Sequence, residues 1–126
     1  MSRKLLIVDD ESHIRTLIEQ TLEELEDEGI EFLTAENGEQ ALEIIQAENP
    51  QLVFLDVMMP KMNGMEVCRK VKKELLLNNV FIVLLTAKGQ ELDRQKGAEV
   101  GADIYMTKPF DPEAILSKAK EVLGLQ

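Results

Sequence analysis

Short runs of apolar residues alternate along the chain with longer segments whose apolar residues recur at helical spacing. Three of the runs are unbroken, at 5–8, 52–55 and 80–85. Unbroken runs of this length are typical of strands buried on both faces of a parallel sheet. Two further segments, 30–35 and 102–106, mix apolar and polar residues and suit the edges of such a sheet. The pattern therefore predicts five strands.

The segments between these runs predict helices. Apolar residues with a period near 3.6 occur over 11–28, about 38–49, about 65–76 and from 112 onward. The segment 90–99 predicts a weak helix, because it has few apolar anchors and Gly97 costs about 1 kcal/mol relative to alanine. Five strand–helix repeats with short connections predict a single α/β domain over 1–126. Its expected fold is the flavodoxin-like, doubly wound (βα)5 fold, with a parallel five-stranded sheet in the order 2-1-3-4-5.

Polar residues suited to chemistry follow four of the five predicted strands. In chain order they are Asp9 and Asp10, Asp56, Thr86 and Lys108. The carboxyl ends of parallel strands meet at one edge of the sheet, and ligands bind there beside the point where the strand order reverses. Taken singly, each of these residues is more often a cap or a solvated side chain. Their shared edge is what predicts a site.

The residue types at this edge indicate phosphoryl transfer. Carboxylates gathered together repel one another unless a cation joins them. Oxygen ligands suit a hard ion, so Mg²⁺ is expected, with Mn²⁺ as an alternative. Asp56 is then a candidate nucleophile, Lys108 a mobile positive charge, and Thr86 a hydroxyl donor to an anion.

The motifs at the strand ends resemble those of the receiver domain of bacterial two-component response regulators, in its stand-alone, chemotaxis-regulator-like form. They span nearly the whole chain in the same order and are Leu6–Ser12 (LIVDDES), Leu55–Gly64 (LDVMMPKMNG), Leu84–Lys88 (LLTAK) and Gly101–Phe110 (GADIYMTKPF). The resemblance implies that Asp56 accepts a phosphoryl group from the phosphohistidine of a sensor histidine kinase or a histidine phosphotransfer protein. Acetyl phosphate is an alternative donor.

The same resemblance implies roles for the remaining site residues. Asp10, Asp56 and the backbone carbonyl of Met58 would bind Mg²⁺ directly, and Asp9 through water. Lys108 would contact the phosphoryl group. Thr86 and Tyr105 match the family's switch pair, which would alter the face built by 90–99, 102–106 and the final helix. Such a protein is not an enzyme with a separate substrate, because it catalyses only its own phosphorylation and dephosphorylation.

Charge and composition limit the classes of partner and the location that we expect for this protein. The formal net charge of −10 argues against binding to nucleic acid or to an anionic membrane surface. No segment has the length of a transmembrane helix or the core of a signal peptide, so a cytoplasmic protein is expected. The single cysteine, Cys68, has helical apolar neighbours and is expected in the core, whereas His13 is expected on the surface.

Three other interpretations stay open. The chain could be the receiver module of a longer regulator, a Mg²⁺-dependent phosphohydrolase, or a receiver-like binding module without chemistry. The hydrolase is disfavoured because Val57-Met58 follows Asp56 where a second acid would be expected. Ile104 and Ala114 lack the charges that the DNA-binding branch of the family uses for dimer contacts, so a monomer with an unidentified downstream protein target is expected.

Overall fold

Five parallel strands form one sheet in the order β2-β1-β3-β4-β5, as predicted. The computed structural model describes residues 3–87, 101–108 and 110–125. The strands are β1 (Arg3–Val8), β2 (Ile30–Ala35), β3 (Leu52–Asp56), β4 (Phe81–Ala87) and β5 (Ile104–Lys108). Every residue of β3 is buried, whereas the edge strands β2 and β5 carry partly exposed residues.

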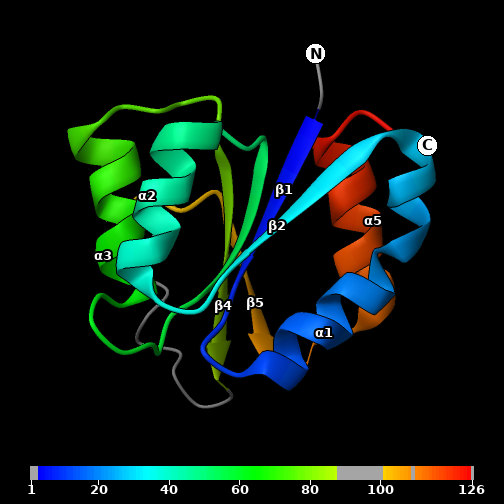
Figure 1. The fold of residues 1–126 in the computed structure, drawn as a ribbon, viewed down its shortest axis with the longest axis horizontal. Helices are drawn as coiled ribbons and strands as arrows, with labels where there is room; N and C mark the ends of the chain where they lie inside the picture. The colour runs from blue at the N-terminus through cyan, green and yellow to red at the C-terminus, as the bar shows by residue number, and fades with distance from the viewer. Residues whose placement is uncertain (1–2, 88–100, 109, 126) are drawn as a thin grey trace.

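Two helical layers enclose the sheet (Figure 1). Helices α2 (Gly38–Glu48) and α3 (Gly64–Arg69) cover one face, and α1 (Ser12–Thr21) and α5 (Pro112–Val122) cover the other. Alternate residues of each strand feed the two cores, so that Val53 and Leu55 face α2 and α3 while Leu52 and Phe54 face α1 and α5. Cys68 is buried in the first of these cores, as predicted.

Asn37 and Asp111 cap the starts of α2 and α5, which agree with the helices predicted from about 38 and from 112. The Asn37 side chain accepts a hydrogen bond from the backbone N–H of Gln40, and the Asp111 side chain accepts one from Glu113. Pro112 occupies the first turn of α5, where its missing N–H costs nothing. Both caps satisfy backbone donors that a helix start leaves unpaired.

The helix predicted over 11–28 is shorter than expected. The α-helix ends at Thr21, and the rest is a 3₁₀ helix, η1 (Glu23–Glu28), which ends at Gly29 with a φ of 83°. Carboxylates four residues apart repel along an α-helix, and acids near its C-terminus oppose the helix dipole. Such acids crowd this segment, and they are Glu23, Glu24, Glu26, Asp27 and Glu28.

The helix predicted over 65–76 also changes character partway. After α3 the chain continues as one π-helical stretch, η2 (Lys70–Glu74), in which the Leu75 N–H bonds to the Lys70 carbonyl at 2.7 Å. This wider turn accompanies an ion pair between Lys72 and Asp103, whose charged atoms lie 2.9 Å apart. The helix predicted over 90–99 lies outside the described residues.

The ends of β4 and β5 extend beyond the predicted runs. Thr86 and Ala87 continue β4, and Lys108 is the last residue of β5, because the ladder continues through the pairs Thr86 with Thr107 and Ala87 with Lys108. Within the described part of the chain, no helix is long and apolar enough to cross a membrane.

Candidate functional site

One lysine joins two aspartates at the carboxyl edge of the sheet. The Lys108 Nζ lies 2.7 Å from Oδ2 of Asp9 and 3.1 Å from Oδ1 of Asp56. Asp56 ends β3, Lys108 ends β5, and Asp9 directly follows β1. Three separate strands therefore bring these charges together, as the strand order predicts.

Both aspartates are buried although they are charged. Asp9 has no exposed surface and Asp56 is 5% exposed. Burial and the neighbouring Asp9 carboxylate raise the pKa of Asp56 to about 6, although Lys108 opposes the change. Burial lowers the pKa of Lys108, but the hydrogen bond to Asp9 and the charge of Asp56 outweigh it, so the net pKa is raised. Lys108 therefore stays charged and holds together two carboxylates that would otherwise repel.

The loop after β1 gathers further carboxylates. Oxygen atoms of Asp9, Asp10 and Glu11 lie within 4.8 Å of one another. Asp10 and Glu11 are exposed, so their carboxylates are open to an ion from solvent. An all-oxygen donor set of this kind fits Mg²⁺ or Mn²⁺. The Lys108 Nζ lies between Asp9 and Asp56 and balances part of the negative charge at this edge.

Hydrogen bonds hold this acidic loop in place. The backbone N–H of Glu11 donates to Asp9 Oδ1 at 2.9 Å, and Nη1 of Arg15 donates to the Asp9 backbone carbonyl at 2.6 Å. With Oδ2 of Asp9 engaged by Lys108, both carboxylate oxygens of Asp9 have protein partners.

Thr86 and Tyr105 lie on neighbouring strands near the same edge. Leu85 pairs with Asp56 in the sheet register, so Thr86 is one residue beyond the strand-end carboxylate. Thr86 pairs with Thr107, and alternation along β5 then places Tyr105 on the same face of the sheet as Thr86. Tyr105 is partly buried and packs against the core beneath α2 and α3. The structure thus brings the predicted switch pair onto one face.

The side chain of Met58 is exposed to solvent. It is 62% exposed, whereas Met59, Met62 and Met65 pack against the core. Apolar residue type alone would place all four methionines in the packing, but in the structure Met58 is largely exposed.

The turn beneath Asp56 depends on a glycine. A Cβ atom at Gly64 would lie 2.2 Å from the backbone oxygen of Asp56. The backbone N–H of Gly64 also donates to the Val57 carbonyl at 2.9 Å. The start of α3 therefore presses directly on the end of β3, and only glycine leaves room for that contact.

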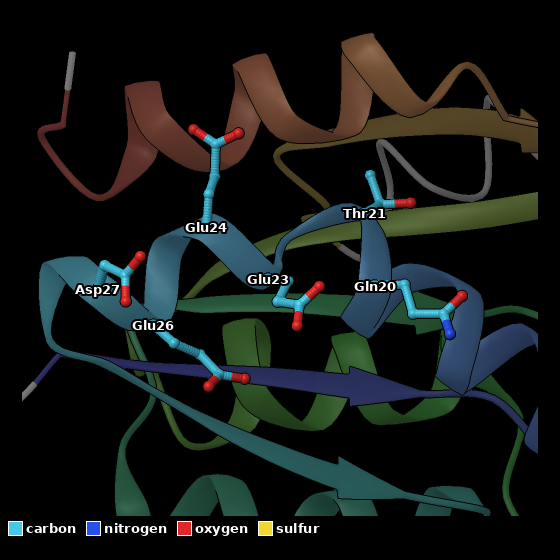
Figure 2. Close-up of a pocket in the computed structure, with 6 residues that line it drawn as sticks. All are labelled: Gln20, Thr21, Glu23, Glu24, Glu26 and Asp27. Atoms are coloured by element: carbon cyan, nitrogen blue, oxygen red, sulfur yellow. The ribbon is translucent and has the colours of Figure 1, made fainter.

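Among the hollows lined by described residues, one lies away from this edge and another lies at its border. One, of about 490 Å³, lies along α1 and η1 and is lined by Gln20, Thr21, Glu23, Glu24, Glu26 and Asp27. Figure 2 shows that its side chains are polar and mostly acidic, and none belongs to the predicted site. The other, of about 120 Å³, is apolar apart from Lys108 and is lined by Ile14, Leu17, Lys108, Phe110 and Pro112. An apolar surface thus borders the reactive edge.

The doubly wound sheet and its acidic edge, bridged by a lysine, define an α/β domain of the flavodoxin-like class. Residues 5–120 match the family described as the response regulator receiver domain. The match covers most of the chain, so the chain belongs to this family of two-component signalling proteins.

Curated relatives and solved structures agree with that assignment. The chain is 44% identical over 123 residues to the alkaline phosphatase synthesis transcriptional regulatory protein PhoP of Bacillus subtilis, covering 98% of this chain and 49% of PhoP. It is 43% identical to the phosphate regulon transcriptional regulatory protein PhoB of Pseudomonas aeruginosa, covering 98% of this chain and 52% of PhoB. The chain thus spans about half the length of these relatives.

Solved structures of similar length also match. Chemotaxis protein CheY4 of Vibrio cholerae has a TM-score of 0.82 and 34% identity, with 97% of this chain and 99% of that chain covered. A CheY-like receiver domain protein of Methanospirillum hungatei has a TM-score of 0.85 and 31% identity, with 98% and 95% covered. These neighbours share the predicted fold.

Sequence reasoning missed three residues that shape the site. They are Glu11 in the acidic group, Arg15 on the Asp9 carbonyl and Gly64 beneath Asp56. Glu11 adjoins the predicted acidic pair, so its position was a usable signal. The other two act through contacts that residue type alone does not indicate.

Proposed function

We propose that Asp56 is the phosphoacceptor of this receiver domain. The observation that carries the proposal is the Lys108 Nζ, which touches both Asp56 and Asp9 beside the Asp10–Glu11 loop. The pKa of Asp56 is raised only to about 6, so at neutral pH its carboxylate is ionised and can act as a nucleophile. The ammonium group of Lys108 beside it balances the negative charge.

In the proposed step, an Asp56 carboxylate oxygen attacks the phosphorus of a phosphohistidine. The new O–P bond forms as the P–N bond breaks, and the imidazole leaves with the bonding electron pair and takes a proton from solvent. Lys108 neutralises the phosphoryl oxygens, and Asp9, Asp10, Asp56 and the Met58 carbonyl would hold Mg²⁺. The ion would supply further charge neutralisation when bound. Attack of water on the phosphorus then breaks the Asp56 O–P bond and releases inorganic phosphate. Asp56 returns to a carboxylate, so no separate substrate is turned over.

We propose that Thr86 and Tyr105 transmit the change. The phosphoryl group carries about −1.5 to −2 charges and strong acceptor oxygens. The Thr86 hydroxyl lies one residue beyond the pairing partner of Asp56, so it is placed to donate to such an oxygen. Movement of Thr86 would vacate space on the face it shares with Tyr105 and draw that ring inward. The surface around β5 and α5 would then differ between the two states.

The proposed partners are a sensor histidine kinase or phosphotransfer protein as donor and a protein target on the switched face. The apolar hollow lined by Leu17 and Phe110 borders Lys108 and offers a contact beside the donor phosphorus. We propose that residues 1–126 form one receiver unit. Its net charge of −10 argues against binding to nucleic acid or to an anionic membrane surface. We place it in the cytoplasm as a monomer.

A second role follows from the relatives rather than from a different site. PhoP and PhoB are named as transcriptional regulatory proteins, and this chain matches about half of each. The same phosphoacceptor chemistry would then govern a domain attached to the receiver. Both roles require Asp56 to be phosphorylated.

Incubation with acetyl phosphate and Mg²⁺, followed by intact mass measurement, tests the proposal. We expect one phosphoryl group that is labile to hydroxylamine and absent when a chelator is present or when Asp56→Ala is used. Asp27→Ala, at an exposed acid on η1, is the matched control and should label like the wild type. Phosphate retained on Asp56→Ala would refute the assignment. Steady turnover of a phosphomonoester would instead support the hydrolase.

A further inference from the structure

The loop between β3 and α3 contains a strained turn. Lys61 has a φ of 68°, a left-handed backbone conformation that residues other than glycine rarely adopt. The backbone N–H of Met62 donates to the Pro60 carbonyl at 2.8 Å, which closes a three-residue γ-turn around Lys61. A γ-turn with a positive φ at its centre is the rare and strained form. Strain of this kind persists only where the surrounding structure holds the chain in place.

Both ends of this loop are fixed by the elements that they join. The Val57 N–H donates to the Leu85 carbonyl at 3.1 Å, and the Val57 carbonyl accepts from the Gly64 N–H at 2.9 Å. At the other end, Asn63 begins α3 with a capping box. The segment 58–62 therefore spans two fixed points, and its path depends on what supports the γ-turn in its middle.

The start of α2 supports that turn from outside the loop. Gly38, the first residue of α2, is buried. A Cβ atom at Gly38 would overlap the backbone carbonyl of Met62 and would lie 2.7 Å from the Met62 Cβ atom. These atoms are fixed by the backbone and cannot rotate away, so a side chain here would displace the helix or the loop. The helix buries Ala41 and Ile45 in the core, whereas the turn is largely exposed, so the loop would give way.

We infer that Gly38 is a positioning residue for the cation site. Because Gly38 has no side chain, α2 lies directly against the γ-turn at Met62, and the turn in its place fixes the segment that carries Met58. The backbone carbonyl of Met58 is a proposed ligand of Mg²⁺, so the inference rests on the proposed function. It adds to that function a residue on a different element, one that acts on the ion only through the loop.

The variant Gly38→Ala, made in the whole chain, tests the inference. Its control is Gly29→Ala, at a position with a φ of 83° and no atom within 4 Å, which should lower stability through backbone strain alone. Amide hydrogen exchange with chelator present gives a readout that needs no metal. We expect the Met62 and Gly64 amides to exchange about tenfold faster in Gly38→Ala, because the loop opens more often. In Gly29→Ala they should exchange as in the wild type.

Binding of Mg²⁺ gives the second readout. The rise in the midpoint of thermal unfolding with Mg²⁺ concentration yields an apparent dissociation constant. Gly38→Ala should raise this constant about tenfold, as is typical when a group that orients a metal ligand is altered. Labelling of Asp56 by acetyl phosphate at saturating Mg²⁺ should fall less than about twofold, because Asp56 itself stays in β3. Gly29→Ala should leave both values unchanged, and a wild-type constant in Gly38→Ala would overturn the inference.

A change within the turn keeps the inference testable if Gly38→Ala does not fold. Proline fixes φ near about −65°, so Lys61→Pro cannot form the γ-turn, whereas Lys61→Gln keeps it and controls for the lost charge. Lys61→Pro should also raise the Mg²⁺ dissociation constant about tenfold, and Lys61→Gln less than about twofold. Combined with Gly38→Ala it should add little, because both changes displace the same turn. A wild-type constant in Lys61→Pro, or full additivity in the double variant, would overturn the inference.

Failure of the inference can be told apart from failure of the proposed function. If acetyl phosphate labels the wild type in a Mg²⁺-dependent way while Gly38→Ala binds Mg²⁺ like Gly29→Ala, only the role of Gly38 falls. If Mg²⁺ does not stabilise the wild type and labelling is insensitive to chelator, the cation site falls, and the inference falls with it.

Discussion

Replacing Asp56 with asparagine should stabilise the cation-free protein. Asn keeps the size of the side chain and removes the charge that is buried beside Asp9. Burial and Asp9 raise the pKa of Asp56 from an ordinary 3.8 to about 6, so the folded state disfavours the ionised form. The free energy of unfolding of the wild type therefore carries a penalty that Asp56→Asn lacks.

The size of the penalty follows from the pKa difference. Each pKa unit corresponds to about 1.4 kcal/mol, so two units set a ceiling near 3 kcal/mol. The carboxyl edge is open to water beside Asp10, which screens the charges and reduces the expected gain to about 1–2 kcal/mol. Lys108 keeps its contact with Asp9 in the variant, so no buried charge is left alone.

The gain should depend on pH with a definite sign. The folded-state pKa of Asp56 lies above the ordinary value, so the penalty is absent below about pH 3.8 and complete above about pH 6. Wild-type stability attributable to this group is thus lost as pH rises through that window. The difference between Asp56→Asn and wild type should grow from about pH 4 to pH 6 and then level off.

Urea unfolding followed by circular dichroism, with chelator present, measures the difference at about pH 5 and pH 7.5. Asp27→Asn, an exposed acid, is the control and should change stability by less than about 0.5 kcal/mol at both values. Added Mg²⁺ should reduce the difference in free energy of unfolding between Asp56→Asn and wild type, because the cation relieves the repulsion among the wild-type carboxylates. The reasoning would be refuted if Asp56→Asn were less stable than wild type at pH 7.5, or if the difference in free energy of unfolding were the same at both pH values.

Three further outcomes are expected. Gly64→Ala should lower the free energy of unfolding in urea by about 3 kcal/mol, because the added Cβ would lie 2.2 Å from a backbone oxygen. The control Gly124→Ala, with a φ of 73° and no atom within 4 Å, should lower it by only about 1 kcal/mol. Equal losses in the two variants would contradict the steric argument. Cys68 is buried and burial raises its thiol pKa to about 12, so a disulfide reagent should label it only after unfolding, and rapid labelling of the native protein would count against that. Tyr105 is the single tyrosine in a chain without tryptophan, so its fluorescence should change on treatment with acetyl phosphate and Mg²⁺. Thr86→Ala should abolish that change while still accepting the phosphoryl group, and an unaltered response would remove Thr86 from the switch.

Patterns along the chain were enough to predict the architecture. The unbroken apolar runs before Asp9, Asp10 and Asp56 identify central strands, and mixed runs identify the edges, because burial on both faces excludes polar residues. Strand order then follows from short right-handed connections, and with it the meeting of these acids at one edge. The caps at Asn37 and Asp111 were equally readable, since they depend on residues only two or three positions away.

Features that depend on distances across the fold could not be read in this way. The bridge from Lys108 to Asp9 joins residues 99 positions apart, and whether Nζ meets one carboxylate or two is a matter of packing. The raised pKa of Asp56 arises from burial that its own neighbours in the chain do not reveal.

The same holds where local pattern and local energetics disagree. Helical spacing predicts one helix over 11–28, yet repulsion among its acids converts the end to 3₁₀ geometry while Leu25 stays buried. Apolar character alone was also a poor guide to Met58, which the turn after β3 leaves exposed. Periodicity thus determines which elements form and where they meet. The charge state and reach of each side chain at that meeting point depend on contacts made only when the chain is folded.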